Sequence, residues 1–271
     1  MAESCSATTV GDYREVEFTA SGSTEAWRMR EGTRRERMRA STDLDIRRQA
    51  RKLLVANGRD AVSLRAIARE MGMTAPALYR YYGSREALLF QVCEDVCGEL
   101  SVELGEVLEP VDVDDHAGKV FAVCRGFRGW ALRHPQEFAL VFATPVEETG
   151  AQRSQPGGDQ FAGVFLRTVA PLMLEGGFEI RSERVPSDMH QVPATDERAL
   201  ADAFSTAGLE VPSDRIRPDD VYFMLTWWVR VYGHVALEVF GRFPFAVDDA
   251  DRVFESLLGE LRHDLGLDRG E

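Results

Sequence analysis

Residues 63–82 read SLRAIAREMGMTAPALYRYY and form two short amphipathic segments separated by a glycine. In the first segment, apolar residues recur at helical spacing and create one apolar face; they are Leu64, Ile67, Ala68 and Met71. Gly72 follows, where a helix commonly ends on a residue that tolerates positive φ. Thr74 offers a hydroxyl to cap a second helix, and Pro76 suits the first turn of that helix because no N–H is needed there. The stretch therefore predicts two short helices joined by a tight turn.

The predicted second helix has an inward and an outward side. Leu78 and Tyr82 are four residues apart and are expected to face the first helix. Ala68 is small enough to let the two helices cross closely. The outward side carries Ala75, Pro76, Tyr79 and Arg80. This arrangement is typical of a helix-turn-helix, whose second helix enters the DNA major groove. A helical hairpin without a role in DNA binding is the alternative.

The sequence on either side extends this pattern. Residues 50–89 read ARKLLVANGRDAVSLRAIAREMGMTAPALYRYYGSREALL, with an Asn57-Gly58 stop after a first helix and a Tyr-Gly-Ser passage into a fourth. This ordered string of about forty positions resembles the tetracycline-repressor (TetR) family of regulators. Arg85 stands where the family usually has lysine, and Tyr82 where it often has phenylalanine, so charge and bulk are kept.

The resemblance implies an all-α protein in which a three-helix DNA-binding domain with a helix-turn-helix precedes a helical domain for ligand binding and dimerisation. We expect a disordered acidic tail over residues 1–33, the DNA-binding domain over 34–88 and the second domain over 89–271. Further helices are predicted at residues 42–57, 84–108, 117–133, 136–142, 161–174, 196–207, 219–240 and 248–265.

The predicted DNA contacts fall into two groups. Arg80 is the first candidate to contact a base, with Thr74, Ala75 and Pro76 near the groove edge. Six residues are placed for phosphate contacts, which set register without carrying sequence information: Ser63, Arg65, Tyr79, Tyr81, Ser84 and Arg85. Arg39 belongs to a basic arm before the first helix, with Arg34, Arg35 and Arg37, that either reaches the DNA or is a solvated charge run.

The charge distribution agrees with a DNA-binding segment on an acidic protein. The chain has a formal net charge of −13, whereas residues 28–85 carry 15 basic and 6 acidic residues, a net charge of +9. Lys52 and Lys119 are the only lysines among the 32 basic residues. Arginine can make bidentate contacts to phosphate and guanine, but the bias runs through the whole chain, so a GC-rich genome explains it equally well.

The C-terminal half is expected to form a homodimer through its last two helices, as the resemblance implies. Both helices carry an apolar stripe that a four-helix interface would need, and core of the same subunit is the alternative. The stripe residues are Val221, Leu225, Trp228, Tyr232, Val235, Val239, Val253, Leu257 and Leu261. Residues 130–142 and 228–243 also resemble a C-terminal subclass named for a Trp-His-Gly motif, although this chain has Tyr232-Gly233-His234 after the tryptophan.

A small-molecule pocket is the other implication for the C-terminal half. The candidates are mainly aromatic, which favours an apolar or aromatic effector. They are Phe121, Cys124, Phe127, Trp130, Phe138, Phe142, Phe165, Met173, Trp227 and His234. Each could instead be ordinary core.

Other classes of site are less well supported by the sequence. Cys93 and Cys97 are four apart on a predicted helix, where core filling is favoured over a redox switch. Asp112, Asp114 and Asp115, which precede His116, suit a helix N-terminus better than a metal site. Neither a signal peptide nor a membrane span is expected, so we predict a cytoplasmic protein without cofactor.

The leading hypothesis is a ligand-responsive transcriptional regulator, a repressor that binds a palindromic operator. A helical sensor or carrier that acts through protein contacts without DNA is the second hypothesis. An enzyme is the third, and the sequence contains no glycine-rich phosphate loop, nucleophile elbow or HExxH motif.

Overall fold

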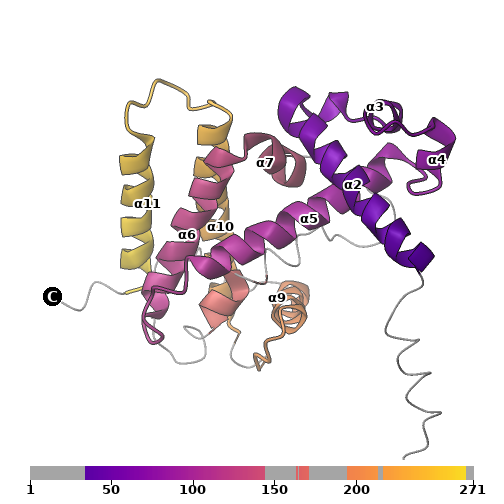
Figure 1. Ribbon diagram of the computed structural model, residues 1–271. Coiled ribbons are helices and arrows are strands. Elements are labelled where there is room, and N and C mark those ends of the chain that lie inside the picture. Colours follow the sequence, from indigo (N-terminus) through magenta and orange to yellow (C-terminus); the bar gives the residue numbers. More distant parts are fainter. Residues whose placement is uncertain (1–33, 144–162, 164, 171–193, 213–215, 267–271) are drawn as a thin grey trace, which may run out of the picture. The chain divides into compact units, whose positions relative to one another are not determined.

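The computed structural model describes residues 34–143, 163, 165–170, 194–212 and 216–266 (Figure 1). Its regular elements are helices, as the sequence predicts. They are α2 (Arg34–Asn57), η1 (Arg59–Ala61), α3 (Leu64–Glu70), α4 (Ala75–Tyr79), α5 (Arg85–Glu106), α6 (His116–Arg133), α7 (Pro135–Phe142), α9 (Ala194–Thr206), α10 (Pro218–Val239) and α11 (Ala250–Asp264). In the described part, no helix combines the length and apolar character needed to cross a membrane.

The chain divides into two compact units, of which the first ends at Asp45 and the second begins at Ile46. In the first unit, the described residues from Arg34 onward are helical, so the basic segment is the start of α2 and not an arm before it. The expected start at Thr42 was wrong because its hydroxyl donates to the Met38 carbonyl at 2.9 Å, inside the helix. Arg, Glu, Met and Ala dominate residues 34–40, and these residue types favour helix.

The second unit begins with an N-terminal module that consists of α2 from Ile46, η1, α3, α4 and the first turns of α5. Its core contains Ile46, Ala50 and Leu54 of α2, which are buried together with Ile67 and Leu78. The predicted apolar positions of α3 and α4 therefore do face each other. Burial of a large aliphatic side chain contributes about 1.5–3 kcal/mol, so this small core is the main source of the module's stability.

Backbone signals fix where the short helices begin and end. The Ser63 hydroxyl caps α3 by accepting from Ala66 N at 3.2 Å, and the Ser84 hydroxyl caps α5 by accepting from Ala87 N at 3.0 Å. Gly72 has φ 64°, and Met73 N donates to Ala68 O at 2.8 Å across the end of α3. Thr74 occupies the N-cap position of α4, but its side chain makes no cap hydrogen bond, which corrects that detail of the prediction.

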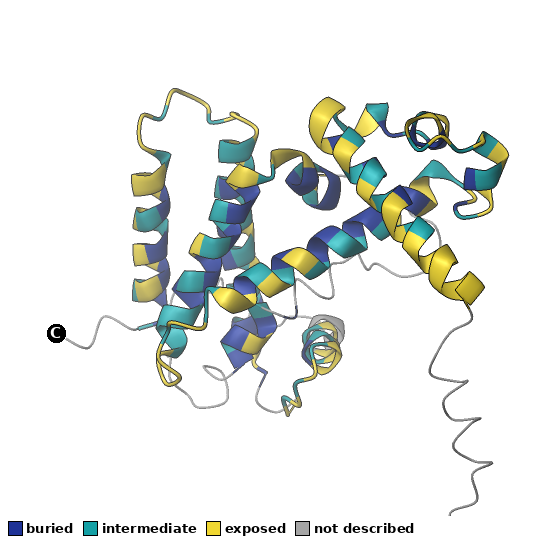
Figure 2. Ribbon diagram, in the orientation of Figure 1, coloured by how far each residue is buried: buried dark blue, intermediate teal, exposed yellow. Residues whose placement is uncertain are grey.

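Helix α5 links the N-terminal module to the remaining helices. One face of α5 is buried along its length, from Leu88 to Leu104 (Figure 2). The main core is continuous from Ile46 to Leu265 and includes buried residues of α6, α7, α10 and α11. A second, smaller core joins α9 to the beginning of α10 through Phe204 and Val221.

The predicted helix limits agree with the observed ones to within about two residues for α5 through α7 and for α9 through α11. Of the helix expected over residues 161–174, the structure describes helical residues 163 and 165–170. The acidic tail, the expected loop at residues 149–159 and the candidate Met173 lie outside the described residues.

The turn between α3 and α4 provides a test of the backbone argument. Gly72→Ala should lower the free energy of unfolding by about 1 kcal/mol, because a side chain at positive φ is strained although a methyl group there would meet no neighbouring atom. Chemical denaturation would measure the change. Gly83→Ala is the matched control, since Gly83 also has open space but lacks a positive φ; an equal loss in both variants would contradict the explanation.

Candidate nucleic-acid interface

Helix α4 is held by its inward side and exposes the other. Leu78 is 0% exposed and Tyr82 is 6% exposed, whereas Tyr79 is 49% exposed. Thr74, Pro76 and Arg80 are also exposed, and Ala75 is half-buried. Arg80 is the C-cap residue of this short helix, so its long side chain extends from the last turn. An exposed tyrosine beside an exposed arginine is a surface that can contact both phosphate and base edges.

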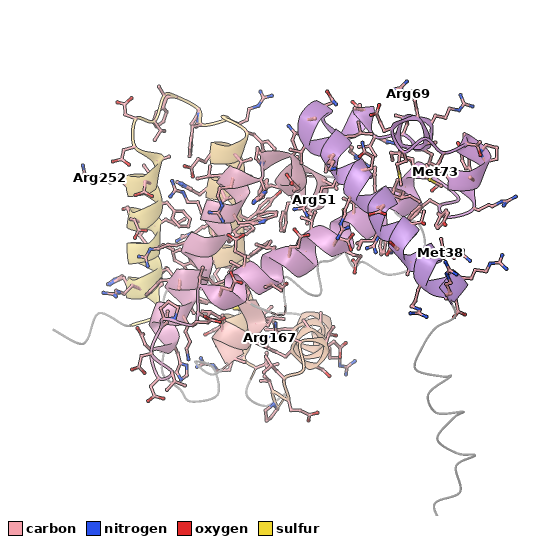
Figure 3. The ribbon with its side chains drawn as sticks, viewed as in Figure 1. Met38, Arg51, Arg69, Met73, Arg167 and Arg252 are labelled. Carbon is pink, nitrogen blue, oxygen red and sulfur yellow. The ribbon has the colours of Figure 1, made fainter. Side chains whose placement is uncertain are left out.

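Positive charge continues from α4 onto α3. Arg65 and Arg69 are both exposed, and Arg69 has a side chain that is 79% exposed (Figure 3). In the described part of the chain, the ion-pair partner of Arg69 is its neighbour Glu70, at 3.8 Å. Exposed pairs of this length contribute little, so the guanidinium remains available to a stronger anionic partner such as a phosphate.

The two predicted serine contacts have a structural role as well. The Ser63 and Ser84 oxygens accept the capping hydrogen bonds, and each hydroxyl still has a proton to donate. Their position at helix N-termini also places unpaired backbone N–H groups nearby, which favours an anion. Tyr81 is half-buried against the main core, while Arg39 lies in the first unit.

Arg85 makes two hydrogen bonds within the protein, and its predicted phosphate contact stays a prediction. Its Nε donates to the Val62 carbonyl at 2.7 Å, and its Nη2 donates to the Arg59 carbonyl at 2.6 Å. These bonds tie the first turn of α5 to the loop before α3. A lysine has no such fork of donors, so these two hydrogen bonds give a reason for arginine at a position where the family usually has lysine.

The aromatic pocket candidates form one packed cluster and several separate residues. Phe127 of α6 lies at the centre, with its ring centroid 6.0 Å from Phe138, 5.5 Å from Phe142, 6.2 Å from Phe165 and 6.0 Å from Trp228. We call these five rings, with Trp130 and Tyr232, the aromatic cluster. The Tyr232 hydroxyl donates to the Phe142 carbonyl at 2.8 Å and joins α10 to α7.

The remaining pocket candidates lie outside the aromatic cluster. Phe121 has the Arg262 guanidinium over its ring at 5.6 Å, and Trp227 has that of Arg230 at 4.8 Å. His234 packs against Phe243 and Phe254. Burial lowers the pKa of His234 and outweighs the opposite effect of Glu238, whose carboxylate lies 3.5 Å away. The sequence could not separate these groups, because all of them sit on apolar helices.

The exposed face of α10 differs from the predicted stripe. Val221 and Val235 of α10 are buried in the chain's own cores, because α6, α9 and α11 cover α10 on those sides. Leu261 of α11 is buried in the main core as well. Trp228 and Tyr232 point into the aromatic cluster, and Val239 is half-buried. The exposed apolar residues of α10 are Leu225 of the prediction at 58%, together with Val229 at 65% and Leu237 at 39%, which the prediction did not include. Val253 and Leu257 of the prediction remain at least partly exposed on α11.

An open groove lies between the C-terminal half of α10, the loop that follows it and α11. It has a volume of about 720 Å³, and Leu237, Phe243, Val253 and Leu257 contribute its apolar lining. Arg230, Arg252 and Glu260 supply charge at the groove. Val229 was left out of the predicted stripe, because in a helix that is apolar on nearly every side the pattern does not show which side stays exposed.

The buried cysteines give a direct test of the redox alternative. Burial raises the pKa of Cys93 to about 11 and the pKa values of Cys97 and Cys124 to about 12. The reactive thiolate is therefore scarce at pH 8, and in a Cys5→Ser chain these thiols should react with Ellman's reagent at least about 100-fold more slowly when folded than when unfolded. Rapid modification of the folded chain would instead favour a redox-active pair at Cys93 and Cys97.

Comparisons with known proteins agree with this geometry. The family of bacterial regulatory proteins of the tetR type matches residues 46–92, and the tetracyclin repressor-like C-terminal domain matches residues 120–261. The HTH-type transcriptional regulators Rv1816 of Mycobacterium tuberculosis and Mb1846 of Mycobacterium bovis are each 29% identical over 241 residues, covering 85% of this chain and 97% of the relative.

Solved structures show the same fold. The structure of SCO4313, a suggested regulatory protein, has a TM-score of 0.58 and 26% identity, and covers 84% of this chain and 98% of its own. A Rhodococcus sp. RHA1 protein of unknown function has a TM-score of 0.57 at 19% identity, over 81% of this chain and 93% of its own. With family matches over both the helix-turn-helix and more than half of the chain, the protein belongs to the TetR family of transcriptional regulators.

Proposed function

We propose that the protein is a ligand-responsive repressor that binds a palindromic operator as a homodimer. The observation that carries this proposal is the orientation of α4, whose inward residues Leu78 and Tyr82 are buried while Tyr79 and Arg80 are exposed. A helix in that orientation can enter the major groove without any change in the module's core. The division into a DNA-binding segment at residues 34–88 and an effector and dimer segment at 89–271 stays a prediction.

The proposed DNA contacts follow from exposure and chemistry. Arg80 is assigned to a base edge, because arginine forms bidentate hydrogen bonds with guanine. Tyr79, Arg65 and the serine caps are assigned to the phosphates, with Arg39 as a further basic contact from the first unit. Thr74, Ala75 and Pro76 are placed at the groove edge.

Dimerisation supplies the second recognition helix. One short helix reads few base pairs, whereas two copies held about 34–36 Å apart read a palindrome and multiply the affinity. The interface we propose uses the exposed side of α10 and α11, with Leu225, Val229 and Val253 as its apolar contacts. Exposed apolar side chains on two adjacent helices favour association with a second copy of the same surface.

The effector we propose is a small apolar or aromatic molecule bound at the aromatic cluster. The rings of this cluster are in mutual contact, so a ligand would have to separate them. A ligand that binds better to a conformation with the wrong spacing of recognition helices would shift the dimer away from DNA. The likeness of residues 130–142 and 228–243 to the Trp-His-Gly subclass stays a prediction alongside this proposal.

The base-contact assignment predicts a specific loss. Arg80→Ala should weaken binding to the protein's own operator, selected from a random DNA pool, by about 1–3 kcal/mol while leaving binding to unrelated duplex DNA nearly unchanged. Fluorescence anisotropy with both duplexes at one salt concentration would measure the difference. Equal losses on the two duplexes would make Arg80 a phosphate contact, and no salt-dependent DNA binding by the unmodified protein would favour a sensor that acts without DNA.

The dimer assignment predicts a change of mass in solution. Val229→Asp should convert the dimer to single chains of 30.3 kDa, because a carboxylate on the buried side of an interface loses its hydration without gaining a partner. Sedimentation velocity would measure the mass. Val102→Asp is the matched control on α5, since Val102 is 64% exposed and Val229 is 65% exposed; dissociation of both variants, or of neither, would contradict this interface.

A further inference from the structure

A buried carboxylate connects α7 to the N-terminal module. The side chain of Glu137 is only 5% exposed, although it carries a charge that water would solvate well. Two basic groups lie near its Oε1 atom, Arg51 Nε at 3.4 Å and His134 Nδ1 at 3.7 Å. Among the residues that the structure describes, these are the ion-pair partners of Glu137. Arg51 belongs to α2, so the charge on α7 is balanced mainly from the N-terminal module.

Arg51 lies on α2 (Figure 3), and its guanidinium group contacts acidic side chains of two other helices, α5 and α7. Its Nη1 donates to Glu99 Oε2 of α5 at 2.5 Å, while its Nε points to Glu137 of α7. Burial lowers the pKa of Arg51, but the hydrogen bonds and charges of Glu99 and Glu137 outweigh burial and raise it above the ordinary value. A second arginine of α2, Arg47, pairs with Asp95 of α5. The link from α2 to α5 is therefore doubled, whereas Arg51 provides the charged link from α2 to α7.

The same short helix α7 also belongs to the aromatic cluster. Phe138, the residue after Glu137, is 0% exposed and has its ring centroid 5.1 Å from Phe142 and 6.0 Å from Tyr232. At the start of α7, the His134 ring lies 5.5 Å from Trp130 with an interplanar angle of 30°. Consecutive residues of α7 thus contact Arg51 on one side and the aromatic rings on the other.

This arrangement limits how α7 can move. Separating Glu137 from Arg51 leaves a buried carboxylate without its main partner, and such a separation is unfavourable because the carboxylate stays shielded from water. A displacement of α7 therefore favours a matching displacement of α2. Helix α2 shares one core with α3 and α4 through Ala50, Leu54 and Leu78, so its movement is passed to the exposed side of α4.

We propose that Arg51 and Glu137 are positioning residues that hold the N-terminal module against α7, so that a change at the aromatic cluster reaches α4 through α2. The consequence for DNA rests on the proposed function, whereas the coupling of α2 to α7 does not. Helix α5 already connects the C-terminal helices to the N-terminal module directly. The Arg51–Glu137 pair adds a second connection, through which a movement of α7 reaches the module.

The coupling can be tested without DNA. In the full chain, Glu137→Gln keeps the shape of the side chain and removes the buried charge, so the fold has no uncompensated ion to bury. Amide hydrogen exchange followed by mass spectrometry should rise about 5-fold in α2 and in α3–α4, with α10 and α11 unchanged. Arg51→Lys is the second variant; it keeps the charge but lacks the fork that reaches Glu99 and Glu137 together, and it should show the same pattern.

A matched control separates this pair from ion pairs in general. Arg125 of α6 donates two hydrogen bonds of 2.7 Å to Glu255, and the two side chains are 52% and 41% exposed. Glu255→Gln should leave exchange in α2, α3 and α4 unchanged, because this pair does not touch the module. Unchanged exchange there in both Glu137→Gln and Arg51→Lys would overturn the proposal.

A double-mutant cycle adds the DNA readout. With a duplex selected by the unmodified protein, Arg51→Gln and Glu137→Gln should each raise the Kd about 5-fold, since a loosened module must be reordered on binding. The double variant should show no more than the larger single effect. Additive losses would overturn the proposal, and raised exchange in a protein that binds no duplex would reject the proposed function while leaving the coupling intact.

Discussion

The contact between α3 and α4 is the constraint on which the functional surface depends. Ile67 and Ala68 on one helix meet Leu78 on the other, and all three are almost completely buried. Because α4 has only five residues, it could not remain helical in isolation. Its conformation and its direction both come from this apolar contact and from the turn at Gly72, which reverses the chain with a positive φ. The exposed pair Tyr79 and Arg80 is therefore oriented by residues that are themselves buried.

The N-terminal module could be predicted in detail because its signals agree at several levels. Periodicity, capping residues and the glycine at positive φ all specify the same two helices between Ser63 and Tyr82. The first helix shows where local capping signals mislead, because its predicted start was eight residues too late. The Ser-Thr-Asp sequence at residues 41–43 resembles a helix start, yet α2 begins at Arg34, since residues with high helix propensity precede it and a threonine can bond back to the preceding turn.

The C-terminal helices show why the predicted site was less accurate. Helix α10 is apolar on nearly every side, so the sequence gives its existence and length but not which side faces which neighbour. The prediction placed Val235 in the interface stripe and left Val229 out, although Val235 is 0% exposed and Val229 is 65% exposed. For the same reason, the prediction grouped Phe121 and Trp227 with the residues of the aromatic cluster, although both lie outside it. Which side is buried depends on α6, α9 and α11, and the pairing of those helices is not encoded in any short stretch.

Some charged side chains form hydrogen bonds within the protein, and others are exposed and available to a partner. The sequence does not distinguish these two groups, because both occur in the same basic segment. Arg85 and Arg51 lie in the same basic segment as Arg65 and Arg80, but their guanidinium groups are bonded within the protein. The net charge of +9 over residues 28–85 therefore overstates the charge that DNA would meet. Exposed arginines lie on α3 and α4 and also along α2, while the bonded ones tie α2 and α5 to their neighbours. One residue type thus serves both the surface that would bind phosphate and the contacts that determine where this surface is held.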